Sequence, residues 1–139
     1  MKVKAAVIRE MGLTQPYADS KPLVIEEIDL AEPGEREVLV KIKAAGLCHS
    51  DLSTVNGNRP RQTPMVLGHE AAGIVTKCGP NIDDLEIGDH VVLVFAPSCG
   101  QCMPCKEGHP GRCGPGQESN AAGTLLGGSI RMSQNNEKV

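Results

Sequence analysis

Alternating apolar and polar positions organise the first half of the chain. The stretch VLVKIKAA, residues 38–45, carries Val, Ile and Ala on one face and two lysines on the other, which is the period of a half-buried β-strand. Residues 2–9 and 22–29 repeat the pattern less regularly, and stretches with Gly and Pro between these segments mark turns. The pattern predicts antiparallel β-structure at the start of the chain.

The second half has less periodicity. Residues 71–77 and 90–96 are rich in Val and Ile, and because HVVLVFA (90–96) lacks a clean alternation, we expect a strand buried on both faces there. Residues 49–57 are expected to hold a short helix with Ser50 as its N-cap. From Pro97 onward Gly, Pro, Cys and Asn dominate. Some element other than an apolar core must therefore organise this tail.

Composition limits the classes of function. The chain has 139 residues, 40% of them hydrophobic and 22% charged, as expected for one domain with one core. Tyr17 and Phe95 are the only aromatic residues, so the core should be aliphatic and stacking platforms for nucleic-acid bases are lacking. A net charge of -3 without a Lys/Arg cluster indicates neither nucleic acid nor an anionic membrane as partner. Small molecules or other protein chains remain.

The lengths of the apolar runs indicate the cellular compartment of the protein. In MKVKAAVIRE, Arg9 interrupts the apolar stretch after four residues, which is too short for a secretory signal. The longest apolar run, Val91 to Pro97, is far shorter than a membrane-spanning helix. We therefore expect a cytoplasmic protein, in which clustered cysteines indicate metal or redox chemistry before disulfides.

Four of the six cysteines form one cluster. Cys99, Cys102, Cys105 and Cys113 follow the pattern C-x2-C-x2-C-x7-C, and short gaps let successive thiolates converge on one tetrahedral centre. A closed site of four thiolates leaves no coordination position for a substrate, so a structural zinc is favoured. Its binding free energy, of order 10 kcal/mol, could organise a lobe at about 97–115 that has almost no apolar side chains.

Three other interpretations of the cysteine cluster stay open. Bacterial iron–sulfur clusters use C-x2-C-x2-C-x3-C-P, and this sequence lacks both the last gap and the proline. Disulfides conflict with the expected compartment. Inert core thiols conflict with the polar, turn-forming residues around them.

A second set of candidate ligands lies in two separate motifs, "GLCHSDL" and "GHEAAGIV". Cys48 and His69 are separated in sequence, so only a fold could join them. Alone, a cysteine is usually a small buried hydrophobe and a histidine a hydrogen-bonded structural residue. Asp51 could accept from the free ring nitrogen of His69, which would fix the tautomer of a metal-bound imidazole. Ser50 offers a hydroxyl that can pass a proton, and Glu70 a hard oxygen ligand.

The alternatives for the polar residues of this set are structural. Ser50 and Asp51 could serve only to cap a helix, and Glu70 could be a solvated strand end. The residues alone do not decide between these roles and metal chemistry.

Together, "GLCHSDL", "VLGHEAAGIV", "IGDHVVL" and the four-cysteine pattern, in this order, resemble the N-terminal half of the zinc-dependent alcohol dehydrogenases of the medium-chain dehydrogenase/reductase family. The resemblance covers essentially the whole chain. It implies a mainly β fold: a GroES-like, partly open β-barrel with short helices and a zinc-knuckle lobe.

The resemblance also implies roles for single residues. Cys48 and His69 would be two of three protein ligands of a catalytic zinc, with Glu70 as a neighbouring carboxylate able to coordinate. Ser50 would hold the substrate hydroxyl and start a proton relay, and Asp51 would orient His69. His49 is carried over as a candidate contact of the cofactor pyrophosphate, and the four clustered cysteines match the structural zinc site of the family.

The implied activity is the interconversion of alcohols and aldehydes or ketones, by hydride transfer to or from NAD or NADP. The third ligand should lie beyond Val139, since Cys78 follows a predicted strand and Cys113 completes the cluster. The only candidate for a dinucleotide fingerprint, "GTLLGG" at 123–128, has the wrong glycine spacing. We therefore expect residues 1–139 to be a catalytic domain that is incomplete at its C-terminus and lacks the Rossmann domain.

Such a chain should be inactive by itself, with its catalytic zinc site partly filled or empty, and its exposed sheet edges would favour self-association. The alternative function is that of a non-catalytic zinc-binding module with a structural or interaction role. The missing third ligand and the missing cofactor domain favour it.

Overall fold

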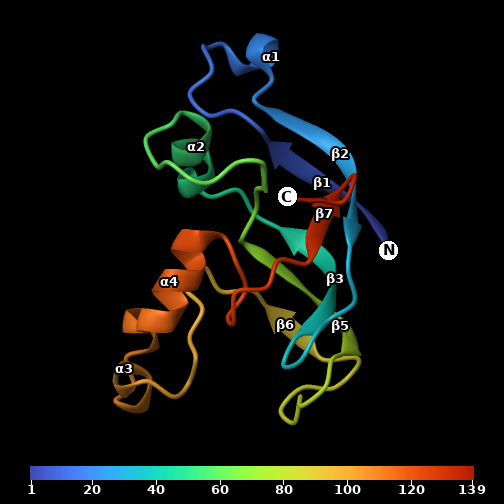
Figure 1. Cartoon of the computed structure of the whole chain (residues 1–139), viewed down its shortest axis with the longest axis vertical. Helices are drawn as coiled ribbons and strands as arrows, with labels where there is room; N and C mark the ends of the chain where they lie inside the picture. The colour runs from blue at the N-terminus through green and yellow to red at the C-terminus, as the bar shows by residue number, and fades with distance from the viewer.

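The structure, a computed structural model that describes all residues 1–139, consists of two antiparallel β-sheets with short helices around them (Figure 1). Its strands are β1 (Lys2–Ile8), β2 (Leu23–Leu30), β3 (Val38–Ala45), β4 (Met65–Val66), β5 (Ala71–Cys78), β6 (His90–Val92), β7 (Met132–Gln134) and β8 (Glu137–Lys138). Its helices are α1 (Tyr17–Ser20), α2 (His49–Val55), α3 (Met103–Lys106) and α4 (Gly114–Ala122), with a 3₁₀ turn η1 (Pro110–Arg112). The predicted mainly β fold with an antiparallel start is confirmed.

The five-stranded sheet has the strand order β4-β1-β2-β7-β8. β1 and β2 pair along their whole length, from Lys2 opposite Asp29 to Ile8 opposite Leu23. β4 pairs with the outer edge of β1, and β7 pairs with β2. This sheet therefore joins the start, the middle and the end of the chain.

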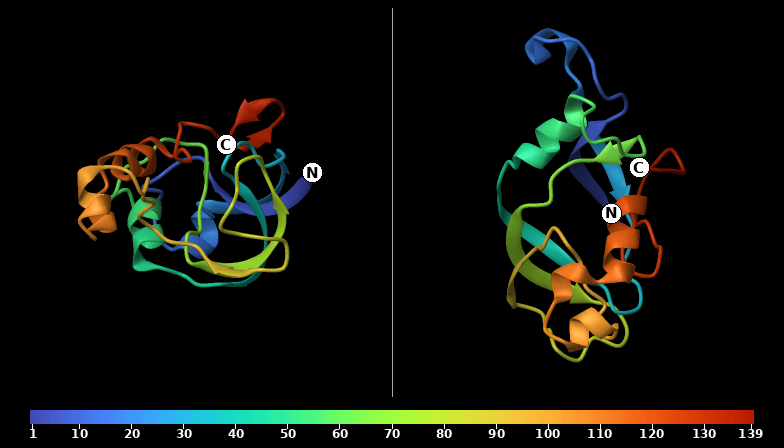
Figure 2. Two further views of the ribbon diagram at one scale, coloured as in Figure 1. Left: turned by 90° about the horizontal axis from the view of Figure 1, so that it is seen from below. Right: turned by 90° about the vertical axis from the view of Figure 1, so that its left-hand side faces the viewer.

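The three-stranded sheet has the order β3-β5-β6, and irregular pairing bends it. The register between β3 and β5 shifts at Leu39/Val40 and again at Ile42/Ala44, and such bulges increase local twist and curvature. Gly73 of β5 lies against this bend, where a Cβ would be only 2.5 Å from the carbonyl oxygen of Lys41. The sheets curl into a partly open barrel, as the views in Figure 2 show.

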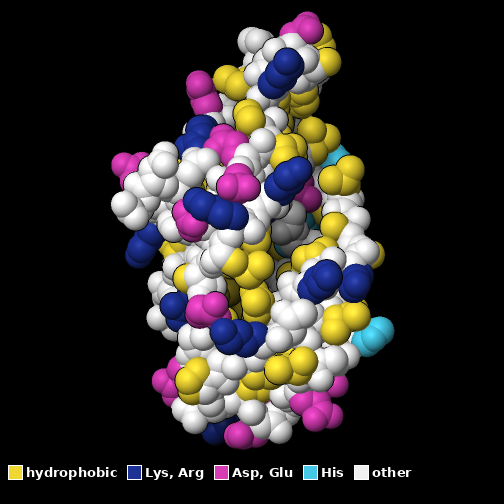
Figure 3. Space-filling model, turned by 90° about the vertical axis from the view of Figure 1, so that its right-hand side faces the viewer, with side chains coloured by type: hydrophobic (Ala, Val, Ile, Leu, Met, Phe, Trp, Pro, Cys, Tyr) yellow, Lys and Arg dark blue, Asp and Glu magenta, His cyan; other side chains and the backbone are white.

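Both sheets and α2 contribute to a small aliphatic core. Val7, Ile8, Ile28 and Val75 are almost completely buried, and Val55 at the end of α2 is 5% exposed. This confirms the predicted aliphatic core. Many apolar side chains stay exposed, and on the face seen in Figure 3 they line a hollow that charged side chains surround.

The tail from Pro97 has more regular structure than the sequence indicated. α3, η1 and α4 form a lobe beside the second sheet (Figure 1). α4 was not predicted, because its sequence GPGQESNAA has no apolar stripe and begins with Gly and Pro. It is the longest helix, with nine residues, and no helix has the length and apolar character needed to cross a membrane.

Three further predictions are wrong in part. The segment 90–96 forms a strand only over His90–Val92, and Val92 and Val94 are 76% and 72% exposed, because no second layer covers this end of the sheet. Helix α2 begins at His49 with Cys48 as its N-cap, so Ser50 lies inside the first turn. The predicted half-buried face of β3 holds at its start, but Ile42 and Ala44 are exposed.

Candidate metal centres

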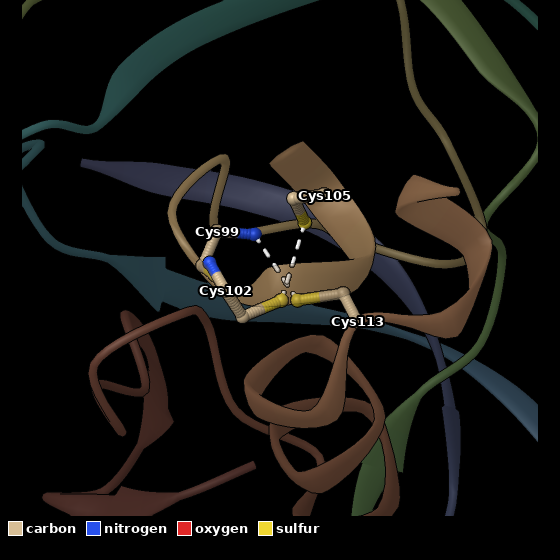
Figure 4. Close-up of side chains that lie close together, drawn as sticks. All are labelled: Cys99, Cys102, Cys105 and Cys113. Carbon is tan, nitrogen blue, oxygen red and sulfur yellow. Dashed lines mark hydrogen bonds between the residues drawn. The ribbon is translucent and has the colours of Figure 1, made fainter. Parts of the chain in front are cut away.

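The four clustered cysteines come together in the lobe. Their sulfur atoms all lie within 4.8 Å of one another, and Figure 4 shows the side chains gathered around one centre. Cys99 and Cys102 lie on the loop before α3, Cys105 within α3, and Cys113 at the N-cap of α4. Short elements that each begin or end beside a cysteine therefore shape the cluster.

Backbone groups point at the sulfurs, as expected for a site that holds thiolates. The N–H groups of Cys99 and Gly116 donate to Sγ of Cys113 at 3.2 Å and 3.3 Å, and Cys102 N–H donates to Sγ of Cys99 at 3.4 Å. The backbone N–H groups of Gln101 and Cys102 lower the pKa of Cys99 to about 6. Burial, followed by the neighbouring Cys102 thiol, raises the pKa of Cys105 to about 11.

The sulfur spacing fits one ion with four thiolate ligands. Cys102 Sγ and Cys105 Sγ are 3.5 Å apart, whereas a tetrahedral zinc with Zn–S bonds of about 2.3 Å separates its sulfurs by about 3.8 Å. A disulfide would bring two sulfurs to about 2.05 Å, and all six cysteines are free thiols. The structure thus speaks against disulfides and fits the four-thiolate interpretation.

The second candidate centre joins the two motifs that are distant in sequence. One ligand atom each of Cys48, His69 and Glu70 lie within 4.8 Å of one another. The backbone N–H of Gly46 donates to the carbonyl of Glu70 at 2.7 Å, which fixes the end of β3 beside the start of β5. A Cβ at Gly46 would lie 2.8 Å from Oε2 of Glu70, so the glycine leaves room for that carboxylate.

The two ring nitrogens of His69 have different partners. Nδ1 lies 3.2 Å from Oδ1 of Asp51, the contact that the sequence led us to expect. Nε2 lies 3.3 Å from Oγ of Ser50. An Asp51 carboxylate that accepts from Nδ1–H leaves Nε2 as the lone-pair nitrogen, which is the nitrogen a metal would bind.

Helix α2 positions Asp51 through a second contact. Oδ2 of Asp51 accepts the backbone N–H of Cys48 at 3.2 Å, so the carboxylate caps the helix with one oxygen and contacts His69 with the other. The capping role and the orienting role, considered as alternatives from the sequence, are therefore compatible. One soft thiolate, one imidazole and one carboxylate are a donor set that suits zinc.

The remaining candidates lie outside these contacts. His49 is the first residue of α2, is exposed, and has Nδ1 3.4 Å from Oγ of Ser53. Cys78 lies at the end of β5 and donates its thiol to the carbonyl of Leu85 at 3.7 Å. It belongs to neither cluster.

Sequence reasoning missed an aromatic and a basic residue beside the second centre. The ring of Phe95 lies 4.7 Å from that of His69, centroid to centroid, and the Arg59 guanidinium carbon lies 4.9 Å from the centre of the Phe95 ring. The available signal was compositional: Phe95 is the only phenylalanine in the chain. Its neighbours in space come from the loop before β4 and the loop before β5, which no periodicity connects.

Comparison with known proteins identifies the domain. Residues 34–134 match the family described as the alcohol dehydrogenase GroES-like domain. The chain is 39% identical to S-(hydroxymethyl)glutathione dehydrogenase of Synechocystis sp., over 100% of this chain and 36% of that protein. It is 41% identical to alcohol dehydrogenase B of Mycobacterium tuberculosis, over 100% of this chain and 35% of that protein.

Solved structures agree with the sequence comparison. An alcohol dehydrogenase zinc-binding domain protein from Burkholderia ambifaria superposes with a TM-score of 0.85 at 37% identity, covering 99% of this chain and 35% of that one. The chain thus spans about a third of the length of the proteins that it matches. From the motifs, the fold and these matches, the chain belongs to the zinc alcohol dehydrogenases of the medium-chain dehydrogenase/reductase family and carries their GroES-like domain.

Proposed function

We propose that this chain is the catalytic-domain portion of a zinc-dependent alcohol dehydrogenase that interconverts alcohols and aldehydes or ketones with NAD or NADP. The observation that carries the proposal is the convergence of Cys48, His69 and Glu70, with Asp51 on the second ring nitrogen of His69. Because the chain spans about a third of its relatives, hydride transfer is assigned to the complete protein. This portion alone is proposed to be inactive.

Each residue of the centre has a proposed task. Cys48 and His69 would hold a catalytic zinc, and Glu70 would stand beside them as an exchangeable ligand. A zinc ion there supplies a Lewis acid that polarises an alcohol or carbonyl oxygen. Asp51 keeps the imidazole in one tautomer and one orientation. Ser50, whose Oγ is 3.3 Å from Nε2 of His69, would bind the substrate hydroxyl and start a proton relay, accepting the substrate proton as it passes its own proton on.

The other proposed roles concern the lobe and the surroundings. Cys99, Cys102, Cys105 and Cys113 would hold a structural zinc, and exposed His49 would contact the cofactor pyrophosphate. A cytoplasmic location would keep these thiols reduced and available as ligands. Exposed apolar residues, such as Leu47 at 98% exposure, are consistent with self-association of this portion.

A zinc-binding module without catalysis is the second candidate. It is favoured because the two clusters differ in their ligands. The first cluster offers four thiolates for a structural metal, whereas the second offers only a single cysteine, a histidine and an exposed glutamate.

A chimera separates the two candidates. We would graft residues 1–139 in place of the matching segment of the Mycobacterium tuberculosis alcohol dehydrogenase B, and follow alcohol-dependent reduction of nicotinamide. The proposal expects turnover, which Cys48→Ser lowers by roughly a hundredfold or more. Cys78→Ser, a thiol outside both clusters, is the control and should leave turnover unchanged.

Metal binding is read in parallel on the 139-residue chain. Cobalt titration should show one tight thiolate-rich site and one weaker site, and Cys48→Ser should remove only the weaker one. A folded, metal-loaded chimera without turnover, or a weaker site that survives Cys48→Ser, would contradict the catalytic assignment and leave the zinc-binding module.

A further inference from the structure

A cavity of about 330 Å³ extends from Phe95, whose ring contacts His69 of the second centre, to Cys113 of the four-cysteine cluster. It lies between the loop that holds Arg59 and Arg61, the segment 95–97, and the start of α4. Its volume is in the range of small-ligand sites, which begins at about 300 Å³.

Asn120 of α4 forms hydrogen bonds to two other segments that line the cavity. Its side-chain oxygen and its backbone carbonyl accept from Arg61 at 3.0 Å and 3.3 Å. Its Nδ2 donates to the carbonyl of Phe95 at 2.8 Å. The cavity is thus framed by hydrogen bonds between segments that are far apart in sequence, and its two arginines are held on one side of it.

The charge of the cavity is unbalanced. Arg59 and Arg61 both line it, while no aspartate or glutamate does, and the one other ionisable group in its lining is the Cys113 thiol. Neither arginine belongs to an ion pair, unlike Arg9 and Arg131 of the same chain. Burial, with the nearby positive charge of Arg59, lowers the pKa of Arg61. Two partly buried cations side by side are unfavourable unless an anion joins them.

Contacts of the Phe95 ring connect this charge to the candidate metal centre. The Arg59 guanidinium covers one part of the Phe95 ring, and the same ring packs on His69. Phe95 also lines the cavity. The guanidinium carbon and the imidazole centre lie 4.9 Å and 4.7 Å from the centre of the Phe95 ring, so a short carbon chain can span the distance between them.

We propose that Arg59, supported by Arg61, binds the anionic oxygen group of the substrate, a carboxylate or a phosphate, while the hydroxyl or carbonyl of the same molecule lies at the Cys48–His69 centre. The substrate class is then that of short alcohols and aldehydes with an acidic group at the other end. Arginine suits this role because its planar fork binds such oxygens through two hydrogen bonds. The substrate assignment rests on the proposed function, whereas the anion site itself does not.

The test is a binding titration of the zinc-loaded, 15N-labelled chain. Binding is monitored through the NMR signals of the Arg59 and Arg61 Nε–H groups. The probes are 4-hydroxybutyrate, 3-hydroxypropyl phosphate and the uncharged match 1,4-butanediol. We expect both anions, and not the diol, to shift these signals, and added salt to weaken binding. Comparison of the two anions shows whether carboxylate or phosphate is preferred.

Variants locate the site. Arg59→Gln should weaken anion binding by roughly tenfold. Arg36→Gln, which changes an exposed arginine outside the cavity, should not. Arg61→Gln also removes the bonds to Asn120, so the amide spectrum is checked first for an intact fold. Equal binding of the diol and 4-hydroxybutyrate, or unchanged anion affinity in Arg59→Gln, would overturn the proposal.

The two proposals fail separately. Anion binding that depends on Arg59, together with a folded, metal-loaded chimera that shows no turnover, would remove the dehydrogenase function and keep the anion site. Metal binding and chimera turnover without Arg59-dependent anion binding would keep the dehydrogenase function and remove the anion site.

Discussion

At the scale of single residues, a few carboxylates hold distant segments in place. Asp51 joins the start of α2 to His69. Glu37, just before β3, accepts from Arg131 at 2.7 Å and 3.2 Å, from Ser129 at 2.7 Å and from Gly34 N–H at 2.8 Å. Both oxygens of each carboxylate accept hydrogen bonds. Removing either carboxylate therefore leaves several donors without a partner.

For Asp51 we expect two variants to separate its tasks. Asp51→Asn keeps an acceptor for the Cys48 N–H but no longer offers His69 a charged partner, so zinc or cobalt affinity at the second centre should fall by roughly 10–100-fold with little change in stability. Asp51→Ala should cost the same affinity and in addition about 1 kcal/mol of folding stability through the lost cap.

Calorimetric metal titration and urea unfolding measure the two effects. Asp83→Asn, on an exposed residue, is the matched control. Metal affinity that Asp51→Asn leaves intact would refute the orienting role.

Glu37 should make stability depend on pH. Its hydrogen bond from Arg131, with those from Gly34 and Ser129, lowers its pKa from 4.5 to about 2. Because the folded pKa lies below the unfolded one, the stabilisation is complete above pH 4.5 and is lost as the pH falls toward 2. Glu37→Gln should therefore cost about 1–2 kcal/mol at neutral pH, after allowance for solvent screening, and less in acid.

The measurement is the free energy of unfolding in urea at neutral pH and near pH 3. Glu10→Gln, on an exposed side chain, serves as control. An equal loss of stability for Glu37→Gln at both pH values would show that its charge does not matter.

At the scale of elements, the lobe depends on close backbone approach. Gly116 in the first turn of α4 is buried, and a Cβ there would lie 1.8 Å from the carbonyl oxygen of Pro97. Cys113, Gly116 and Pro97 are thus packed together, and the cysteine cluster shares this contact through the Gly116 N–H. The start of α4 and the metal centre are therefore one structural unit.

Gly116→Ala should destabilise the lobe, since α4 would have to move away from Pro97. We expect a loss of about 1–3 kcal/mol and faster release of zinc to a chelator. Gly111→Ala, where a Cβ would meet nothing within 4 Å, is the control in the same lobe. Equal zinc release rates for the two variants would contradict the proposed packing.

At the scale of the whole molecule, the sheets and the lobe have different sources of stability. The buried aliphatic residues Val7, Ile8, Ile28 and Val75 belong to the sheets, whereas Cys113 is the one fully buried side chain of the lobe. Hydrophobic burial can maintain the sheets. The lobe has little such burial, and we expect it to depend on the proposed structural metal.

Zinc removal should therefore act locally. Chelation, or Cys102→Ser, should raise hydrogen exchange and protease sensitivity over residues 97–122 while β1, β2 and β5 stay protected. Cys78→Ser should change neither. A lobe that remains protected without metal would show that the cysteines are not its main support.

The sequence by itself determined the strands at 2–8, 23–30, 38–45 and 71–78, because strand periodicity is local. It also determined the four-cysteine centre, since gaps of two residues bring thiolates together with little help from the rest of the fold. Helix α4 and the shortened β6 escaped prediction, because packing against Pro97 and the absence of a covering layer decide them.

Only the tertiary structure decided the second centre and its surroundings. The β3–β5 pairing brings Cys48 to His69, and the approach of α4 to the 59–61 loop closes a cavity around two arginines without acidic partners. These contacts join segments separated by tens of residues, so no local pattern records them. The arrangement of this centre therefore follows from pairing and packing, whereas the four-cysteine cluster is already indicated by the order of residues.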